Sequence, residues 1–342
     1  MKITKILVAI SFLFTVIGSA NAGELSVTGN METTYSSSTG STTGNPLGTD
    51  RELKFAGSTE LDNGITVSVM QDTGDTLLFS NSQLAFSNSM GTIYIGSDSD
   101  PMDSIDDITP SAYEEANGSG SGSYVDIGSA ANQMGLGLKY NIPFAGALDV
   151  KYYPKVDGAK SADNATSADT NPGVGNATSA SLATDLGALT DVLAGAKLTT
   201  GITVMENNTG VNMDDTLEMT AALTYAYGPV KLGYQNKYNE LGETATNNHL
   251  RYRDDIIGIA YAINDSLSIS YNNIKSTVSN NSFAEANAVT SVNGTEQKTE
   301  ALNIGYAIGG MTIGIQTAST DNAGYVVAAE DDSNTIGISV AF

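Results

Sequence analysis

Apolar and polar residues alternate along much of the chain with a period of two. The alternation is clearest at the C-terminal end, where Ile336, Ile338, Val340 and Phe342 interleave with small or polar residues. The same pattern recurs in the segments 134–140, 217–225, 267–271, 302–308 and 311–316. A period of two places successive side chains on opposite faces of a β-strand. The pattern therefore predicts an all-β protein whose strands each have one apolar face.

The segments that join these strands are alternately short and long. The short ones contain the Gly, Asn, Asp and Pro residues of tight turns: 62–64, 89–91, 142–146, 228–229, 264–265 and 309–310. The long ones are polar: 36–50, 98–131, 156–180, 206–215, 240–248, 276–297 and 318–332. About 15 strands are recognisable, and another is expected between Ser179 and Leu189. This alternation predicts a transmembrane antiparallel up-and-down β-barrel of about 16 strands, with long extracellular loops and short periplasmic turns.

The first 22 residues have the features of a cleavable secretory signal. Lys2 and Lys5 precede an apolar run, and Ala20-Asn21-Ala22 fits the A-x-A cleavage pattern. The run has about 12 residues, whereas a membrane-spanning helix needs about 20. We therefore predict that 1–22 is removed on export through the inner membrane. Residues 23–342 then form a single barrel domain in the bacterial outer membrane.

Composition and charge further restrict the possible partners, sites and membrane segments of the chain. The net charge of −23 at pH 7 makes nucleic acid an implausible partner. There is no cysteine, so an exported chain of this kind has neither disulfides nor a thiolate metal site. No apolar stretch after Gly23 is long enough for a helical span. A closed barrel can still enter a membrane, because its strands alternate in polarity.

Four tyrosines share the apolar face and stand close to a short turn: Tyr140, Tyr227, Tyr261 and Tyr306. Aromatic girdles occupy this position in membrane barrels, where the apolar belt meets the headgroups. We interpret these tyrosines as one such girdle. The alternative is the general preference of tyrosine for β-strands.

Several segments resemble Gram-negative general diffusion porins. The similarity is carried by the opening strand 24–35, the hairpins 53–64 and 84–96, and the terminal Phe342, and it spans the mature chain. The resemblance implies a homotrimer of 16-stranded barrels in outer-membrane lipid and lipopolysaccharide. It implies water-filled channels for small hydrophilic solutes and ions. It also implies that Phe342 is an assembly signal for the outer-membrane assembly machinery, and that 98–131 is a third loop that folds into the lumen as a constriction.

The segment 98–131 concentrates acidic residues. Seven carboxylates lie within 18 residues, namely Asp98, Asp100, Asp103, Asp106, Asp107, Glu114 and Glu115. Fixed carboxylates in a narrow passage attract cations. We therefore predict an acidic pore lining with a preference for cations, and the strand pattern places Lys54, Lys139 and Lys151 as the opposing basic residues in the lumen. A solvated surface loop is the alternative.

A calcium site is a further interpretation of the same acidic loop. Hard cations such as Ca²⁺ favour clusters of oxygen ligands, here Asp103, Asp106 and Asp107. The spacing of these residues does not match an EF-hand loop. No other cofactor is expected.

The sequence offers little for catalysis. His249 is the only histidine, so a Ser-His-Asp triad or a histidine-ligated metal site lacks parts. No glycine motif for phosphate or dinucleotide binding follows a strand and opens a helix. We predict a channel and not an enzyme. A substrate-selective channel of the same architecture and a surface β-structural or adhesin protein remain as alternatives.

Overall fold

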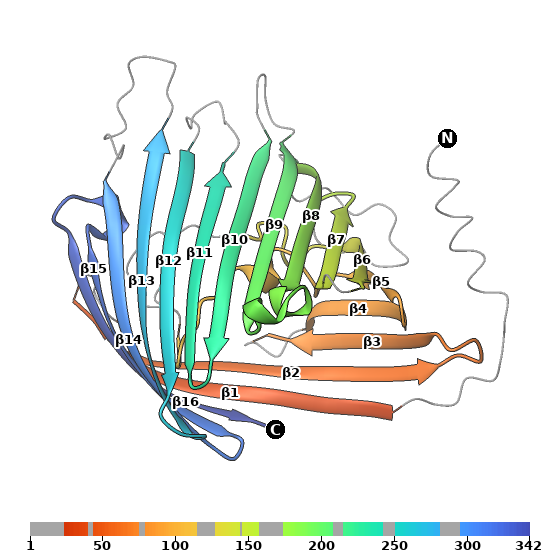
Figure 1. The fold of residues 1–342 in the computed structure, drawn as a ribbon, viewed down its shortest axis with the longest axis horizontal. Coiled ribbons are helices and arrows are strands. Elements are labelled where there is room, and N and C mark those ends of the chain that lie inside the picture. The colour runs from red at the N-terminus through yellow and green to blue at the C-terminus, as the bar shows by residue number, and fades with distance from the viewer. Residues whose placement is uncertain are drawn as a thin grey trace.

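The computed structural model describes residues 24–39, 44–74, 79–114, 127–143, 146–156, 174–207, 215–241, 250–280 and 295–342. Within these residues, sixteen strands form one closed barrel in which every strand pairs with its sequence neighbours and β1 pairs with β16 (Figure 1). The strands are β1 (Glu24–Ser38), β2 (Leu47–Glu60), β3 (Thr66–Thr73), β4 (Phe79–Asn88), β5 (Gly91–Gly96), β6 (Gly135–Ile142), β7 (Gly146–Tyr153), β8 (Val174–Asp185), β9 (Ala196–Asn207), β10 (Thr216–Tyr227), β11 (Val230–Glu240), β12 (Leu250–Ala262), β13 (Leu267–Asn280), β14 (Glu296–Ile308), β15 (Met311–Asp321) and β16 (Glu330–Ala341). The predicted fold class is confirmed. The predicted signal segment lies outside the described residues.

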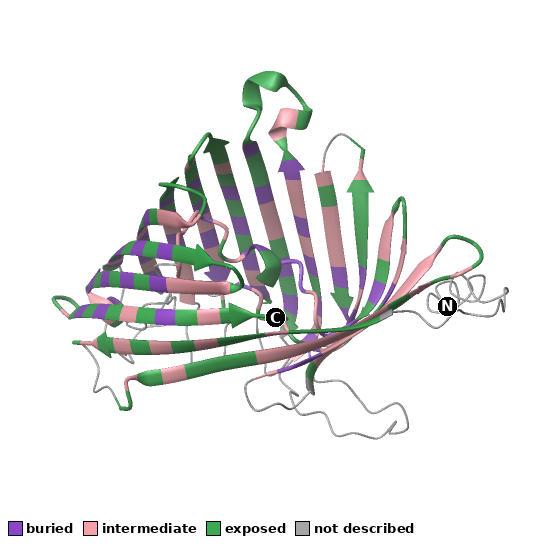
Figure 2. Ribbon diagram, turned by 90° about the horizontal axis from the view of Figure 1, so that it is seen from below, coloured by how far each residue is buried: buried purple, intermediate pink, exposed green. Residues whose placement is uncertain are grey.

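Buried and exposed residues alternate along many of the strands, as the coloured bands in Figure 2 show. On β14, Thr299 and Asn303 are buried inside the barrel, whereas Leu302 and Ile304 are exposed on its outside. The apolar face recognised in the sequence is therefore the outer face. Because paired residues of neighbouring strands share a face, these apolar side chains form a continuous belt around the barrel.

Many strands continue beyond their apolar segments, toward the long loops. β13 extends to Asn280 and β14 begins at Glu296, although 276–297 was expected to be a loop. In this region the outer face carries polar residues such as Arg253 and Lys275. The predicted loops were too long, because the period-two signal disappears where both faces are polar while backbone pairing continues.

The weak eighth strand is present, but its limits differ from the expected ones. β8 covers Val174–Asp185, so it begins inside the segment predicted as the loop 156–180. Its residues are mostly Ala, Ser and Thr, and therefore show no apolar alternation. The turn after β8 contains two short 3₁₀ segments, η4 (Leu186–Ala188) and η5 (Asp191–Leu193). In the described part of the chain, no helix is long and apolar enough to cross a membrane.

The barrel closes where β1 meets β16. Residues Asn30 to Ser38 of β1 pair with Ala341 to Ser333 of β16. Next to the first of these pairs, Asn30 and Ala341, Gly29 and Phe342 exchange backbone hydrogen bonds of 2.8 and 2.9 Å. The terminal residue is thus part of the closing seam of the sheet.

Candidate pore and its inner loop

The loop between β5 and β6, residues 97–134, is hereafter L3, and its described residues lie inside the barrel. The structure describes its two arms, 97–114 and 127–134. The first arm touches inward-facing residues of β7, β9 and β11–β16, and reaches β1. L3 therefore follows the inner wall over about half of its circumference.

Asp100 holds the point where L3 enters the lumen. Its carboxylate accepts the backbone N–H groups of Met102 and Asp103 at 2.7 and 2.9 Å, and it accepts the hydroxyl of Tyr153 on β7. The neighbouring Lys151 donates to the Ser99 carbonyl at 2.6 Å. Asp100 and Lys151 are both buried, which corrects their predicted roles as pore-lining acid and opposing base. Each of them fastens L3 to the barrel.

Glycines on the inner wall leave room for the loop. A Cβ added at Gly305 would lie 2.0 Å from the carbonyl oxygen of Ala112, and one at Gly314 would lie 2.0 Å from the ring of Tyr113. The other glycines with L3 atoms at the Cβ position are Gly201, Gly233, Gly258 and Gly337. A close approach of this kind requires a residue without a side chain. The backbone of L3 therefore packs directly against the strands.

Gln235 on β11 is a polar anchor that bonds L3 at three places. Its amide nitrogen donates to the carbonyls of Ile105 and Asp106 at 2.9 and 2.7 Å. Its amide oxygen accepts the N–H of Ile108 at 3.2 Å. The side chain is fully buried, and these bonds satisfy it. Gln235 thereby fixes the backbone of L3 on either side of the carboxylates Asp106 and Asp107.

Further along the wall, polar side chains hold the backbone of L3 at three places: Asn272 donates to the Pro110 carbonyl (3.0 Å), Ser270 accepts the Ala112 N–H (2.9 Å) and Gln316 donates to the Glu114 carbonyl (3.2 Å). The hydroxyl of Tyr113 then donates to Glu32 on β1 at 2.7 Å. Burial, together with the Glu32 carboxylate, raises the pKa of Tyr113 above its ordinary value. The hydroxyl therefore stays protonated and keeps donating well above neutral pH.

Lys237 on β11 forms ion pairs with two carboxylates of the acidic loop. Its ammonium group lies 2.7 Å from Asp106 and 3.0 Å from Asp107, and its side chain is 1% exposed. Among the described residues, no group of three or more carboxylates or histidines could hold a metal ion. Lys237 thus places a positive charge beside two of the three residues of the Ca²⁺ interpretation, Asp106 and Asp107.

The returning arm of L3 is fixed by Glu218 on β10. Its carboxylate accepts the N–H groups of Gly128 and Ser129 at 2.9 and 3.2 Å, and it also accepts the Ser129 hydroxyl. Ile127 packs with the apolar residues of the first arm, so the two arms share a small core. Gln235, Lys237 and Glu218 were not predicted as loop anchors from the sequence. Their place on the inward face of predicted strands was the one signal available.

The remaining predicted site residues lie in different environments. Asp103 is exposed, whereas Asp98 and Glu114 are partly buried, and Glu115 lies outside the described residues. Lys54 is partly buried and stands opposite Asp72 in the β2–β3 register. Lys139 is more open, and its ammonium group lies 3.5 Å from Asp149. The predicted acids and bases therefore do not form two facing walls.

Comparison with known proteins identifies the family. A family model described as Gram-negative porin matches residues 8–342. The chain belongs to the Gram-negative porin family. Family and fold together make this porin an outer-membrane diffusion channel.

Solved structures share the fold of this porin at low sequence identity. An anion-selective porin from Comamonas acidovorans aligns with a TM-score of 0.67 at 13% identity, over 94% of this chain and 100% of that chain. OmpF of Salmonella typhi, in a complex with daunomycin, aligns with a TM-score of 0.65 at 13% identity, over 94% and 98% of the two chains. No curated protein sequence matches the porin significantly.

The outer face of the porin has the features of a membrane-facing surface. The four tyrosines of the predicted girdle, Tyr140, Tyr227, Tyr261 and Tyr306, are all exposed on this face. Tyr225 and Tyr227 stack on one another with their ring centroids 6.5 Å apart. Aromatic rings at the end of an apolar belt suit the interface between lipid tails and headgroups.

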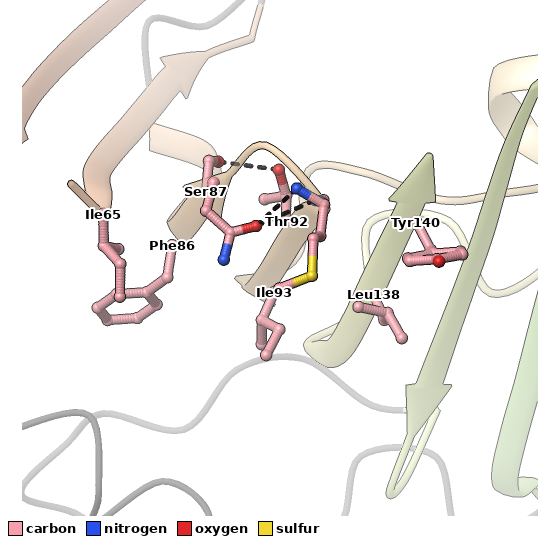
Figure 3. Close-up of a pocket in the computed structure, with 10 residues that line it drawn as sticks. Ile65, Phe86, Ser87, Thr92, Ile93, Leu138 and Tyr140 are labelled. Atoms are coloured by element: carbon pink, nitrogen blue, oxygen red, sulfur yellow. Dashed lines mark hydrogen bonds between the residues drawn. The ribbon is translucent and has the colours of Figure 1, made fainter. Parts of the chain in front are cut away.

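A shallow groove of about 250 Å³ lies beside the β4–β5 turn (Figure 3). It is lined by Phe86, Ile93, Leu138 and Tyr140, which share the outward face of their strands. The groove therefore opens away from the lumen and is not part of the solute path.

Proposed function

We propose that this porin is a general diffusion pore for small hydrophilic solutes and ions, that L3 forms its constriction, and that the pore prefers cations. The position of L3 on the inner wall carries this proposal, because the free side of the loop then borders the remaining passage. Asp103 belongs to L3 and is exposed. Glu32 and Asp50 pair in the β1–β2 register and face the same lumen. Carboxylates from both sides would concentrate cations there.

The alternative is an anion-preferring pore. Lys139, Lys197 and Lys231 are exposed on the lumen side of their strands, close to the short turns. A structural relative is named as an anion-selective porin. These lysines lie toward the periplasmic end and away from L3. We therefore propose that ions are selected at the height of the acidic residues of L3.

The zero-current potential in planar bilayers under a KCl gradient separates these two proposals. We expect a cation-preferring wild-type pore, and a shift toward anions in Asp103→Asn. The shift should shrink at high salt, because the Debye length falls from about 10 Å at 0.1 M to about 3 Å at 1 M. The matched control is Asp191→Asn, which removes an exposed acid from the β8–β9 turn. An anion-selective wild type would overturn the cation proposal.

We also propose that the porin is a homotrimer in contact with lipopolysaccharide. An apolar groove of about 400 Å³ on the outer face of β2–β5, lined by Phe55, Val69 and Leu84, would suit a subunit contact. Near the long loops the outer face carries ion pairs such as Arg251–Glu240 (2.8 Å), which suit a charged headgroup layer. Heat-modifiable electrophoretic mobility of the detergent-extracted porin tests the trimer. Loss of lipopolysaccharide from Arg251→Ala during purification tests the lipid contact.

Cleavage of 1–22 and recognition of Phe342 by the assembly machinery remain proposals as well. The Phe342 ring lies over Gly29, where an added Cβ would come within 2.8 Å of it. Phe342→Ala should lower the yield of assembled porin in the outer membrane. Gly29→Ala is the control for mere disturbance of the seam, because it crowds the ring and leaves the terminal phenylalanine in place. Equal yields of wild type and Phe342→Ala would contradict the signal proposal.

A further inference from the structure

A second loop, on the extracellular side of L3, also turns into the barrel. The β15–β16 loop, residues 322–329 and hereafter L8, carries Tyr325, whose side chain is 6% exposed. The Tyr325 hydroxyl shares a 2.7 Å hydrogen bond with Ser276 of β13. The Gly324 N–H donates to the amide oxygen of Gln297 on β14 at 2.7 Å. Ser276 and Gln297 both face the lumen, so L8 reaches back across β14 on the inside of the barrel.

L8 is held in one shape by its own backbone. Three residues with side chains have positive φ, namely Asn322 (55°), Tyr325 (61°) and Ala328 (61°). Such conformations are costly for residues other than glycine, and they persist where surrounding contacts enforce them. Asn322 supplies two of these contacts, because it donates to the Glu296 carbonyl and accepts the Ala328 N–H, both at 2.9 Å. These contacts hold L8 in its inward position.

L8 and L3 are linked along the same wall. The rings of Tyr325 and Tyr252 are 6.1 Å apart, and Tyr252 also packs on the apolar core of L3. On β13, Ile274 lies between Asn272, which holds L3, and Ser276, which holds L8. The distance from Asn272 to Ser276 is four residues, or roughly 13 Å along the strand. An apolar patch with Ile274 at its centre is buried on the lumen side between the loops, together with Ile256, Ala301 and Ala318.

We propose that L8 forms a second constriction on the extracellular side of L3, and that Tyr325 is a specificity-determining residue that excludes bulky solutes before they reach L3. This inference rests on the proposed diffusion function. Solutes would pass the side of the lumen formed by β1 and β2, where none of the described side chains is buried. The acidic residues at L3 would then select solutes by charge, and L8 would select them by size.

The experiment compares Tyr325→Ala with wild type in liposomes that contain the purified, oligomeric porin. Swelling rates are measured with a monosaccharide, a disaccharide and a trisaccharide. We expect Tyr325→Ala to raise the trisaccharide rate several-fold relative to the monosaccharide rate. Val327→Ala is the matched control, because Val327 belongs to the same loop but is 76% exposed. It should leave the ratio of rates unchanged.

Two further measurements keep the outcome decisive. Ser276→Cys, in this cysteine-free chain, should resist a bulky water-soluble thiol reagent and become reactive when combined with Tyr325→Ala. Tyr325→Phe should show whether the ring alone holds the loop. If an assembled Tyr325→Ala pore keeps the wild-type rate ratio and protects Ser276→Cys, L8 is not a constriction. A wild type that admits no sugar and carries no current would instead overturn the proposed diffusion function.

Discussion

The two sides of the lumen are built differently. On the covered wall, the inner faces of β9–β15, loops lie against the strands, and side chains such as Gln235, Lys237 and Asn303 are fully buried. On the open wall, the inner faces of β1 and β2, Asp50 is exposed and Glu52 and Lys54 are partly exposed. Both walls present polar inward residues in the sequence. Inward polarity therefore serves two purposes, the attachment of loops on one wall and contact with solutes on the other.

The largest difference between the walls should appear when a lysine is removed. Lys237→Met leaves Asp106 and Asp107 without their buried partner, which should cost about 3 kcal/mol of unfolding free energy. Lys54→Met on the open wall should cost less than about 1 kcal/mol, because water screens its charge. Denaturant unfolding of the two variants in lipid vesicles measures both values. Neutralising both acids in the triple variant Lys237→Met/Asp106→Asn/Asp107→Asn should recover part of the lost unfolding free energy. Equal losses for Lys237→Met and Lys54→Met would contradict the distinction between a covered and an open wall.

A smaller effect is expected from the glycines that seat L3. Gly305→Ala places a methyl group 2.0 Å from the Ala112 carbonyl, so the loop must move away from the wall. Overpacking of this kind costs about 1–3 kcal/mol. Gly74→Ala is the control, because its added Cβ would lie 4.0 Å from the nearest atom, the Cβ of Ser80. Single-channel conductance should change in Gly305→Ala and not in Gly74→Ala; an unchanged conductance in both would show that L3 does not border the current path.

The smallest effect concerns the contact between L3 and the open wall. Tyr113→Phe removes the hydrogen bond to Glu32 and should cost about 1 kcal/mol. Because the pKa of Tyr113 is raised in the folded porin, the stabilisation is fully present below the unfolded-state pKa of about 10 and is lost as the pH rises above it. Unfolding curves of both proteins at pH 8 and above pH 10 test this. If the difference in unfolding free energy between wild type and Tyr113→Phe grows with pH, the proposed contribution of the Tyr113–Glu32 hydrogen bond is refuted.

The sequence predicted the barrel better than it predicted the pore. Alternation placed Leu302 and Ile304 on an apolar face and Asn303 on the opposite face, and in the structure these are the outer and inner faces. It failed at β8, where small residues on both faces leave no contrast. The alternation also failed at Lys151 and Asp100. It can assign a side chain to the lumen, but it does not indicate whether a loop will cover that side chain.

The alternating pattern by itself determined which residues face outward and that the strands must close into a barrel, because a membrane admits no unpaired backbone. These constraints are local and repeat along each strand. The tertiary structure alone decided that Lys237, about 130 residues away in sequence, neutralises Asp106 and Asp107, and that Tyr325 turns inward. Such contacts depend on the path of a loop across a finished barrel, and no short-range periodicity records that path.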